Sequence, residues 1–166
     1  MSGFLVAALA ALQVAVLAAV VVLLVRKARA RTLERVEAFL AEREGKGDRV
    51  VLRDDGAVCR GFRSGMKLSS KGNGVLLMMG DGLHFFPYFG RDRFVPWEGT
   101  SSPRTARKVG MSWNSRYSFV VDYDIGDEKG EVGWIVAEPD EWTRAAEAAL
   151  SVLASRRSPG DRPSRA

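Results

Sequence analysis

The uncharged run at the N-terminus constrains this chain more than any other segment. Residues 3–25 contain no charged side chain, and Gln13 is their only strongly polar residue. At 1.5 Å per residue they form a helix about 35 Å long, enough to cross a hydrocarbon core of about 30 Å. We therefore predict a transmembrane helix over residues 3–25.

A cleavable secretory signal is the alternative interpretation of this run. Such signals carry basic residues ahead of an apolar core of about 7–15 residues. Here no Lys or Arg precedes the run, and the run is longer than that core. The Ala28-Arg29-Ala30 triplet resembles a cleavage site but lies among arginines. These features favour a helix that is retained.

The residues that flank the run set its expected orientation. Only Met1 and Ser2 precede it, and basic residues follow it at Arg26, Lys27, Arg29, Arg31 and Arg35. Basic residues beside a membrane helix stay on the cytoplasmic side. We therefore expect a single-pass protein of the cell membrane, with its N-terminus outside and its domain cytoplasmic. The lone cysteine, Cys59, agrees, because it can form no internal disulfide.

The net charge of +5 does not indicate a nucleic-acid partner. Residues 26–35 carry a net +4 and residues 156–166 a net +3, which leaves −2 for residues 36–155. The excess charge therefore belongs to the two flanking segments. We expect Arg26, Lys27, Arg29 and Arg31 to lie at the membrane surface, since each basic residue there gains roughly 1 kcal/mol from anionic headgroups.

Residues 26–46 are predicted to form a basic, amphipathic juxtamembrane helix. Leu33, Val36, Phe39 and Leu40 fall on one stripe, and the glycines of the segment 44–48 end the helix. Packing on the following domain is the simplest use of this stripe. A self-association seam and an interfacial helix are the alternatives.

The next segment changes to strand-like periodicity. Its strand-like runs cover 49–53, 57–68, 75–79, 83–89, 93–97, 117–125 and 132–138, with 105–111 as a further candidate. Turn residues separate them, at 54–56, 69–74, 80–82, 90–92 and 126–131. About seven strands with short links and no intervening helix predict a mainly β, antiparallel barrel or sandwich.

One amphipathic helix closes this domain. Pro139 suits a first helical turn, and Asp140 and Glu141 suit the positive end of the helix dipole. An apolar stripe follows at Trp142, Ala146, Ala149, Leu150 and Leu153. We expect this stripe to cover an open side of the sheet. Residues 156–166 are rich in Pro, Arg and Ser and are predicted to be a disordered basic tail.

Seven antiparallel strands capped by a C-terminal helix resemble the pleckstrin-homology (PH) fold, and residues 49–155 are similar to bacterial PH-like and GRAM-like domains. The resemblance is carried by Val75-Leu76-Leu77, Gly80-Asp81-Gly82, Leu83 to Pro87, Val95-Pro96-Trp97 and the junction with Pro139, Asp140 and Trp142. The Thr-Asp pair that often precedes the second hairpin strand is reduced to Asp81. The resemblance implies a binding module and no catalytic residue.

The sequence offers no convincing catalytic, metal or cofactor site. We expect the lone histidine, His84, to be a packed or surface imidazole, and Cys59 to be a small buried hydrophobe. Residues 122–133 fail the EF-hand pattern at its fifth, sixth and twelfth positions, which are Gly126, Asp127 and Gly133. Residues 69–74 lack the Gly-Lys-Ser/Thr ending of a phosphate-binding loop. We therefore expect an acidic hairpin and a plain loop.

The charges of the domain separate along the sequence. Residues 60–116 carry a net +7 and residues 117–155 a net −7, which should polarise the domain. In lipid-binding PH domains, basic side chains of the early strand-loop-strand unit hold inositol phosphates. The resemblance places Arg63, Lys67 and Lys71 there as candidate ligand-binding residues, with Arg91 and Arg93 expected beside them. A solvated basic surface without a ligand is the alternative.

Together these features predict a membrane-anchored, non-enzymatic PH-like adaptor at the cytoplasmic membrane face. Its expected partners are the lipid bilayer, an unidentified protein or anionic lipid, and not nucleic acid; we expect no cofactor. One alternative is an accessory subunit of a membrane or envelope enzyme complex whose site needs a partner chain. Another is a structural accessory. A deep cleft with convergent polar groups would favour catalysis, and a filled β core would favour binding.

Overall fold

The computed structural model describes residues 2–64, 67–69, 71–109, 112–126 and 128–156. Within these ranges the side chains of 2–8, 62–64, 67–69, 112–115 and 128 are not described. The predicted disordered tail lies outside the described residues, apart from Arg156.

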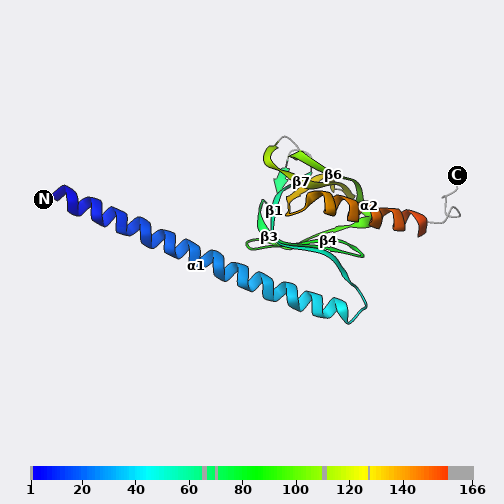
Figure 1. The fold of residues 1–166 in the computed structure, drawn as a ribbon, viewed down its shortest axis with the longest axis horizontal. Coiled ribbons are helices and arrows are strands. Elements are labelled where there is room, and N and C mark those ends of the chain that lie inside the picture. Colours follow the sequence, from blue (N-terminus) through cyan, green and yellow to red (C-terminus); the bar gives the residue numbers. More distant parts are fainter. Residues whose placement is uncertain (1, 65–66, 70, 110–111, 127, 157–166) are drawn as a thin grey trace.

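The two predicted N-terminal helices form one continuous helix, α1 (Ser2–Glu44). Its N-terminal half stands away from the rest of the molecule, and its C-terminal half lies beneath the sheet (Figure 1). The part Leu9–Glu44 includes a stretch of mean hydropathy 2.5, long and apolar enough to cross a membrane, although a signal sequence has the same properties. The helix ends before Gly45, and Gly47 has a φ of +82° that a helix does not allow.

The rest of the chain is mostly antiparallel sheet closed by a helix. Its elements are β1 (Val50–Ser64), β2 (Lys67–Ser69), β3 (Gly72–Met79), β4 (Gly82–Pro87), β5 (Arg93–Pro96), the 3₁₀ turn η1 (Trp97–Gly99), β6 (Thr100–Val109), β7 (Ser112–Ile125), β8 (Glu128–Ile135) and α2 (Pro139–Arg156). Seven strands follow one path, β5-β4-β3-β1-β8-β7-β6, and β2 pairs beside it with β1. The predicted seven-stranded antiparallel architecture with a closing helix is confirmed.

Three predicted turns differ from the structure. Two are shorter than predicted, because residues 72–74 belong to β3 and residues 128–131 belong to β8, and the third is absent. Residues 54–56 do not reverse the chain but lie inside β1, where the register against β3 shifts between Asp54 and Ala57. Asp54 pairs with Leu76 and Ala57 with Gly74, so β1 holds one residue more than β3 does. The extra residue is a β-bulge, which uses the same turn-prone residue types as a reversal.

The apolar interior lies between the inner face of the sheet and α2; we call it the inner core. Figure 1 shows α2 lying across the open side of the curved sheet. Trp142 and Ala146 are buried there, and Ala149, Leu150 and Leu153 pack at its edge. Phe119, at the centre, stacks on Trp134 with ring centroids 6.0 Å apart. The predicted stripe of the last helix thus covers the sheet.

A second apolar cluster lies on the opposite face of the sheet, beneath α1; we call it the outer cluster. Its buried members are Val36, Val75, Leu77, Met79 and Phe86, with Leu33, Phe39, Leu40, Val50 and Tyr88 packed at its edge. The apolar stripe of residues 33–40 therefore contacts β3 and β4. The helix that carries the apolar N-terminal run is part of the folded domain.

Candidate functional site

The contacts between α1 and β4 fix which end of the domain lies toward the apolar part of the helix. At the far end, Arg43 Nη2 lies 2.8 Å from Asp81 Oδ2, just before β4 begins. At the near end, Thr32 Oγ1 donates to the carbonyl of Pro87 at 3.4 Å. Helix and strand therefore run antiparallel, and the loop after β4 lies beside the part of α1 that follows the apolar run.

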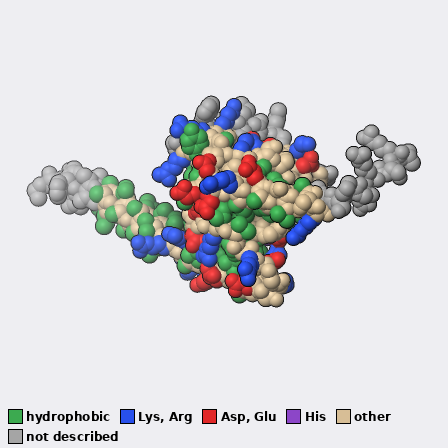
Figure 2. All heavy atoms as spheres, turned by 45° about the vertical axis from the view of Figure 1, so that its right-hand side comes forward, with side chains coloured by type: hydrophobic (Ala, Val, Ile, Leu, Met, Phe, Trp, Pro, Cys, Tyr) green, Lys and Arg blue, Asp and Glu red, His purple; other side chains and the backbone are tan. Residues whose placement is uncertain are grey.

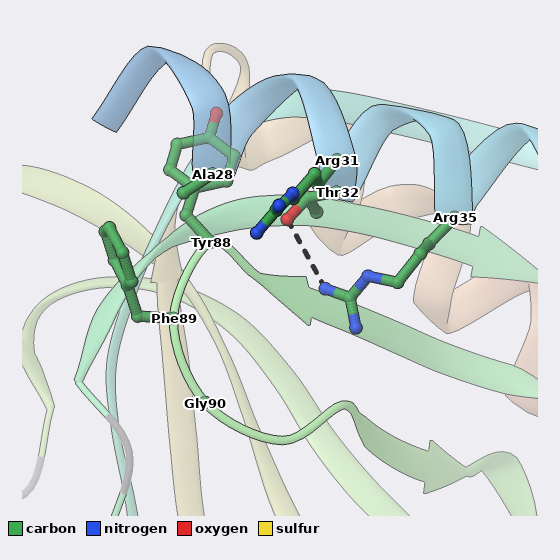
Figure 3. Close-up of a pocket in the computed structure, with 7 residues that line it drawn as sticks. All are labelled: Ala28, Arg31, Thr32, Arg35, Tyr88, Phe89 and Gly90. Carbon is green, nitrogen blue, oxygen red and sulfur yellow. Dashed lines mark hydrogen bonds between the residues drawn. The ribbon is translucent and has the colours of Figure 1, made fainter. Parts of the chain in front are cut away.

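A cleft of about 330 Å³ opens between α1 and this loop. Figure 3 shows Ala28, Arg31, Thr32 and Arg35 on the helix side, and the segment 88–90 on the other side. Arg35 is held in place, because its guanidinium donates to Asp92 at 3.1 Å and to the Pro87 carbonyl at 3.3 Å.

The cleft brings together basic and aromatic side chains. Arg26, Lys27, Arg29 and Arg31 are all exposed, and on the face shown in Figure 2 basic side chains gather where the apolar part of α1 meets the domain. Phe89, at the rim, leaves 66% of its surface in solvent. Beside it, Tyr88 donates from its hydroxyl to the Asp55 carbonyl at 2.5 Å.

Burial raises the pKa of Tyr88, and the positive charge of Arg29 partly opposes this rise. Arg29 therefore lies close enough to the segment 88–90 to act on it electrostatically. Of the exposed basic residues 26–31, Arg31 lines the cleft itself, and the charge of Arg29 acts on its aromatic side.

Three of the predicted ligand-binding residues lie at the β1–β2 end of the domain. The backbone of Arg63 pairs with Leu68 of β2, and Lys67 pairs with Ser64 of β1, while the side chains of Arg63 and Lys67 lie outside the described residues. Lys71 is exposed, one residue before β3. The pairing of β1 with β2 thus brings the first two positions together on one hairpin.

The other two predicted residues have different surroundings. Arg91 is exposed in the loop between β4 and β5. Arg93 is half-buried, pairs with the inner-core residue Phe85, and its charge acts on the buried Cys59. Directly paired residues share a face of the sheet. Arg93 therefore faces inward, and Arg91 directly follows Gly90, which lines the α1 cleft.

The predicted charge separation is partly neutralised by folding. Arg104, from the basic half of the sequence, donates to Asp122 at 3.1 Å and to Glu131 at 2.7 Å. Lys129 pairs with Asp124 at 2.9 Å. Acidic and basic side chains also alternate over the domain in Figure 2, so the domain is less polarised than its sequence implies.

His84 and Cys59 are packed, as predicted. His84 is 6% exposed, its ring stacks on Phe94 with centroids 4.4 Å apart, and its Nε2 lies 2.9 Å from Asp81 Oδ1. Burial raises the pKa of the Cys59 thiol to about 11, which keeps it protonated. Among the described residues, no three His, Cys, Asp or Glu side chains gather as metal ligands would.

Sequence reasoning missed Phe89 and the cleft. The available signal was the order Tyr88-Phe89-Gly90-Arg91, in which aromatic residues meet a glycine and a basic residue in a turn. The strand pattern instead predicted Phe89 as the end of a strand. Only the docking of α1 shows that this turn faces the basic residues that follow the apolar run.

Known proteins resemble this chain in fold and not in sequence. No protein-family model and no curated protein matches the chain. Among solved structures, it is similar to the Vps36 N-terminal PH domain, with a TM-score of 0.48 and 11% identity over 66% of this chain and 84% of that chain. It is also similar to a chain of the 8S snRNP assembly intermediate, with a TM-score of 0.44 and 13% identity over 70% of this chain and 90% of that chain.

The fold is PH-like. This assignment rests on the chain's own architecture, a seven-stranded antiparallel path with a helix across its open side, since similarity at such low identity carries no functional detail. PH-like domains commonly bind lipids or proteins.

Proposed function

We propose that the chain is a single-pass membrane protein that holds a PH-like binding module, without enzymatic activity of its own, at the cytoplasmic face of the cell membrane. The observation that carries this proposal is the continuity of α1. One helix has exposed apolar side chains along its N-terminal part and packs on the sheet through Leu33, Val36 and Phe39.

This continuity favours a fixed orientation of the module against the bilayer. Pro87, whose carbonyl accepts from Thr32, pairs with Gly74 near the start of β3. At that same end of β3, Gly72 pairs with Cys59 of β1. Strand β1 continues past Cys59 to Ser64, so its last residues lie at the end of the sheet near Thr32. The β1–β2 hairpin and the loop after β4 then both face the membrane. Lys71 and Arg91 lie at this end.

The filled interior supports binding more than catalysis. The inner core is occupied by aromatic and aliphatic side chains, and the clefts near Arg31 and near Ser101 are shallow openings of about 330 and 300 Å³ between packed elements. The ligand we propose is anionic lipid, or a protein partner presented at the same surface. Confinement by the helix raises the effective concentration of such a ligand, so weak contacts suffice.

Fractionation and protease protection of the full-length chain with a C-terminal tag test the anchor. We expect the protein to stay in the membrane pellet after alkaline carbonate extraction. We also expect its tag to be protected in intact cells and digested after permeabilisation. A variant that lacks residues 1–25 is the control and should leave the pellet. A mature chain that begins after residue 30 and is found free outside the cell would overturn the proposal.

The lipid part has its own test. The full chain with Lys67→Glu and Lys71→Glu is reconstituted into vesicles with and without anionic lipid, and the protection of the β1–β2 hairpin is followed by hydrogen exchange. We expect anionic lipid to protect the hairpin in the natural chain and not in the variant. Equal protection in both chains would remove lipid as the ligand of this hairpin.

A further inference from the structure

Two arginines line the cleft, and only one of them is bonded to other protein groups. Arg35 is engaged by Asp92 and by the Pro87 carbonyl. Arg31, one turn earlier, makes no hydrogen bond or ion pair with any residue that the structure describes. In Figure 3 it extends from α1 across the space beside Tyr88 and Phe89. A guanidinium placed beside a cleft without a protein acceptor is suited to an anionic ligand.

The position of the cleft along α1 matches the position of the lipid headgroup layer. If the hydrocarbon core ends at Val25, Ala28 lies about 4.5 Å and Arg31 about 9 Å farther along the helix axis. The headgroup layer on each side of a bilayer is about 5–8 Å thick, and an arginine side chain can extend back toward it. Arg31 and the rim residue Phe89 therefore lie where lipid phosphates and glycerol groups are found.

The helix face that lines the cleft continues into the apolar run. Ala28, Thr32 and Arg35 recur at helical spacing, and the positions four and seven residues before Ala28 are Leu24 and Val21. Both are apolar and more than half exposed, at 56% and 57%. An acyl chain that lies along Leu24 and Val21 leads directly to the cleft.

The exposed ring of Phe89 also suits a lipid. It is the most exposed aromatic side chain of the described residues, at 66%, and Arg91 is exposed two residues later. Aromatic rings are enriched at the membrane-water boundary, where they lie among glycerol and headgroup atoms. An exposed phenyl ring on the membrane side of a basic cleft suits a lipid better than a soluble anion.

We propose that this cleft binds the phosphate of an anionic phospholipid of the leaflet that α1 enters, with Arg31 as the phosphate ligand and Phe89 beside the glycerol and upper acyl chain. The site rests on the proposed function, because it requires α1 to be in the membrane. It is separate from the β1–β2 hairpin and belongs to the junction of helix and domain.

The test compares two arginine variants of the full chain in nanodiscs. Arg31→Gln removes the charge of the cleft. Arg26→Gln makes the same change on the opposite face of α1, five residues earlier, and is the matched control. Each chain is released from nanodiscs of mixed phosphatidylglycerol and phosphatidylcholine, and the lipid that stays bound is measured by native mass spectrometry. Phe89→Trp reports depth through quenching by brominated lipids.

We expect the natural chain and Arg26→Gln to retain phosphatidylglycerol in preference to phosphatidylcholine. Arg31→Gln should lower this preference about fivefold more than Arg26→Gln does, the factor that corresponds to about 1 kcal/mol for a phosphate hydrogen bond made in the cleft beyond general attraction to the surface. In the Phe89→Trp variant, the emission of the introduced indole should be quenched most strongly by bromine near the headgroup end of the acyl chain.

Three results would overturn the site. Equal losses in the two arginine variants would mean general attraction to the surface. No lipid preference in the natural chain, or retention of a co-purified protein that masks Phe89, would mean another occupant. Carbonate extraction of the same variants separates the two proposals. If the chain stays in the membrane pellet but shows any of these results, only the proposed lipid site is wrong. If the chain leaves the pellet, the proposed membrane anchor is wrong as well.

Discussion

Strands β3 and β6 belong to one sheet but bury different amounts of their surface. Six consecutive residues of β3, from Gly74 to Met79, are buried. Strand β6 is buried only at its ends, Thr100 and Val109, and the residues between them are half-buried or exposed. An antiparallel sheet commonly has one face on the core and one in water. Strand β6 follows this rule and β3 does not.

The difference identifies α1 as a structural part of the domain. Leu76 and Met78 point into the inner core, whereas Val75, Leu77 and Met79 point into the outer cluster beneath α1. Without the helix, β3 would expose a row of large apolar side chains. The helix that we propose as the membrane anchor therefore also completes the fold, so that anchoring and folding use the same residues.

The largest expected effect lies in the inner core. Phe119 is fully buried and contacts the rings of Trp134 and Trp142, with centroids 6.0 and 5.8 Å away. Phe119→Ala should lower the free energy of unfolding by about 3–5 kcal/mol, through lost burial and a cavity. Denaturant unfolding of the full chain in detergent, followed by tryptophan fluorescence, measures the loss. Phe119→Leu should cost less than about 1.5 kcal/mol, and equal costs for both would contradict the close packing of this ring.

A charge buried in the outer cluster should show that the outer cluster and the inner core unfold independently. Val36 is fully buried beneath α1, so Val36→Asp places an unpaired carboxylate in apolar surroundings at a cost of roughly 2–4 kcal/mol. This cost cannot exceed the free energy of docking α1, because the helix can detach. Hydrogen exchange should therefore rise along β3 and β4 and stay low in β7 and β8.

The matched control is Ala38→Asp, which introduces the same side chain at an exposed position two residues away. It should leave hydrogen exchange unchanged and should alter the free energy of unfolding by no more than about 0.5 kcal/mol. If Val36→Asp instead unfolded β7 and β8 as well, the two clusters would form one cooperative unit, and the contrast between β3 and β6 would have no energetic counterpart.

Much of the fold could be predicted because its signals are local. The Gly-Asp-Gly turn at 80–82 fixed the hairpin of β3 and β4, and the helical spacing of Trp142 and Ala146 fixed the face of α2 that is buried. The continuous apolar run 75–79 could not show what covers its second face. When both faces of a strand are buried the alternation disappears, and with it the information about its two neighbours.

The site was predicted less well, because its residues are brought together by long-range contacts. Arg93 was grouped with Arg91 on sequence proximity, but its pairing with Phe85 turns it inward. Arg104 was part of the net charge of +7 counted for residues 60–116, whereas folding places it beside Glu131. The apposition of Arg31 and Phe89 depends on where α1 docks. No local pattern contains that information.

A smaller effect is expected at the close contact between β3 and β4. A Cβ at Gly74 would lie 2.3 Å from the Phe86 carbonyl oxygen and 2.8 Å from the Pro87 Cα, both backbone atoms that cannot move aside. Gly74→Ala should therefore destabilise the doubly buried strand by about 1–3 kcal/mol. Gly80→Ala is the control, since nothing lies within 4 Å of its Cβ position. Equal stability of the two variants in denaturant unfolding would show that the strands can shift apart.

The smallest effect is a dependence on pH at the far end of α1. Burial alone would raise the pKa of Asp81, but its hydrogen bond to His84 and the charges of His84 and Arg43 outweigh burial and lower it. A lowered pKa in the folded state stabilises the protein above the unfolded value, about 3.9, and this stabilisation is lost as the pH falls through the folded pKa.

Asp81→Asn should therefore cost about 1 kcal/mol near neutral pH, because the carboxylate is one-third exposed and partly screened. Below about pH 4 the cost should shrink, since the natural chain then loses the same charge. Unfolding of both chains across this pH range measures the difference. A cost that stayed constant down to acid pH would mean that Asp81 acts as a neutral hydrogen-bonding group, and that the ion pair with Arg43 does not help to hold α1 on β4.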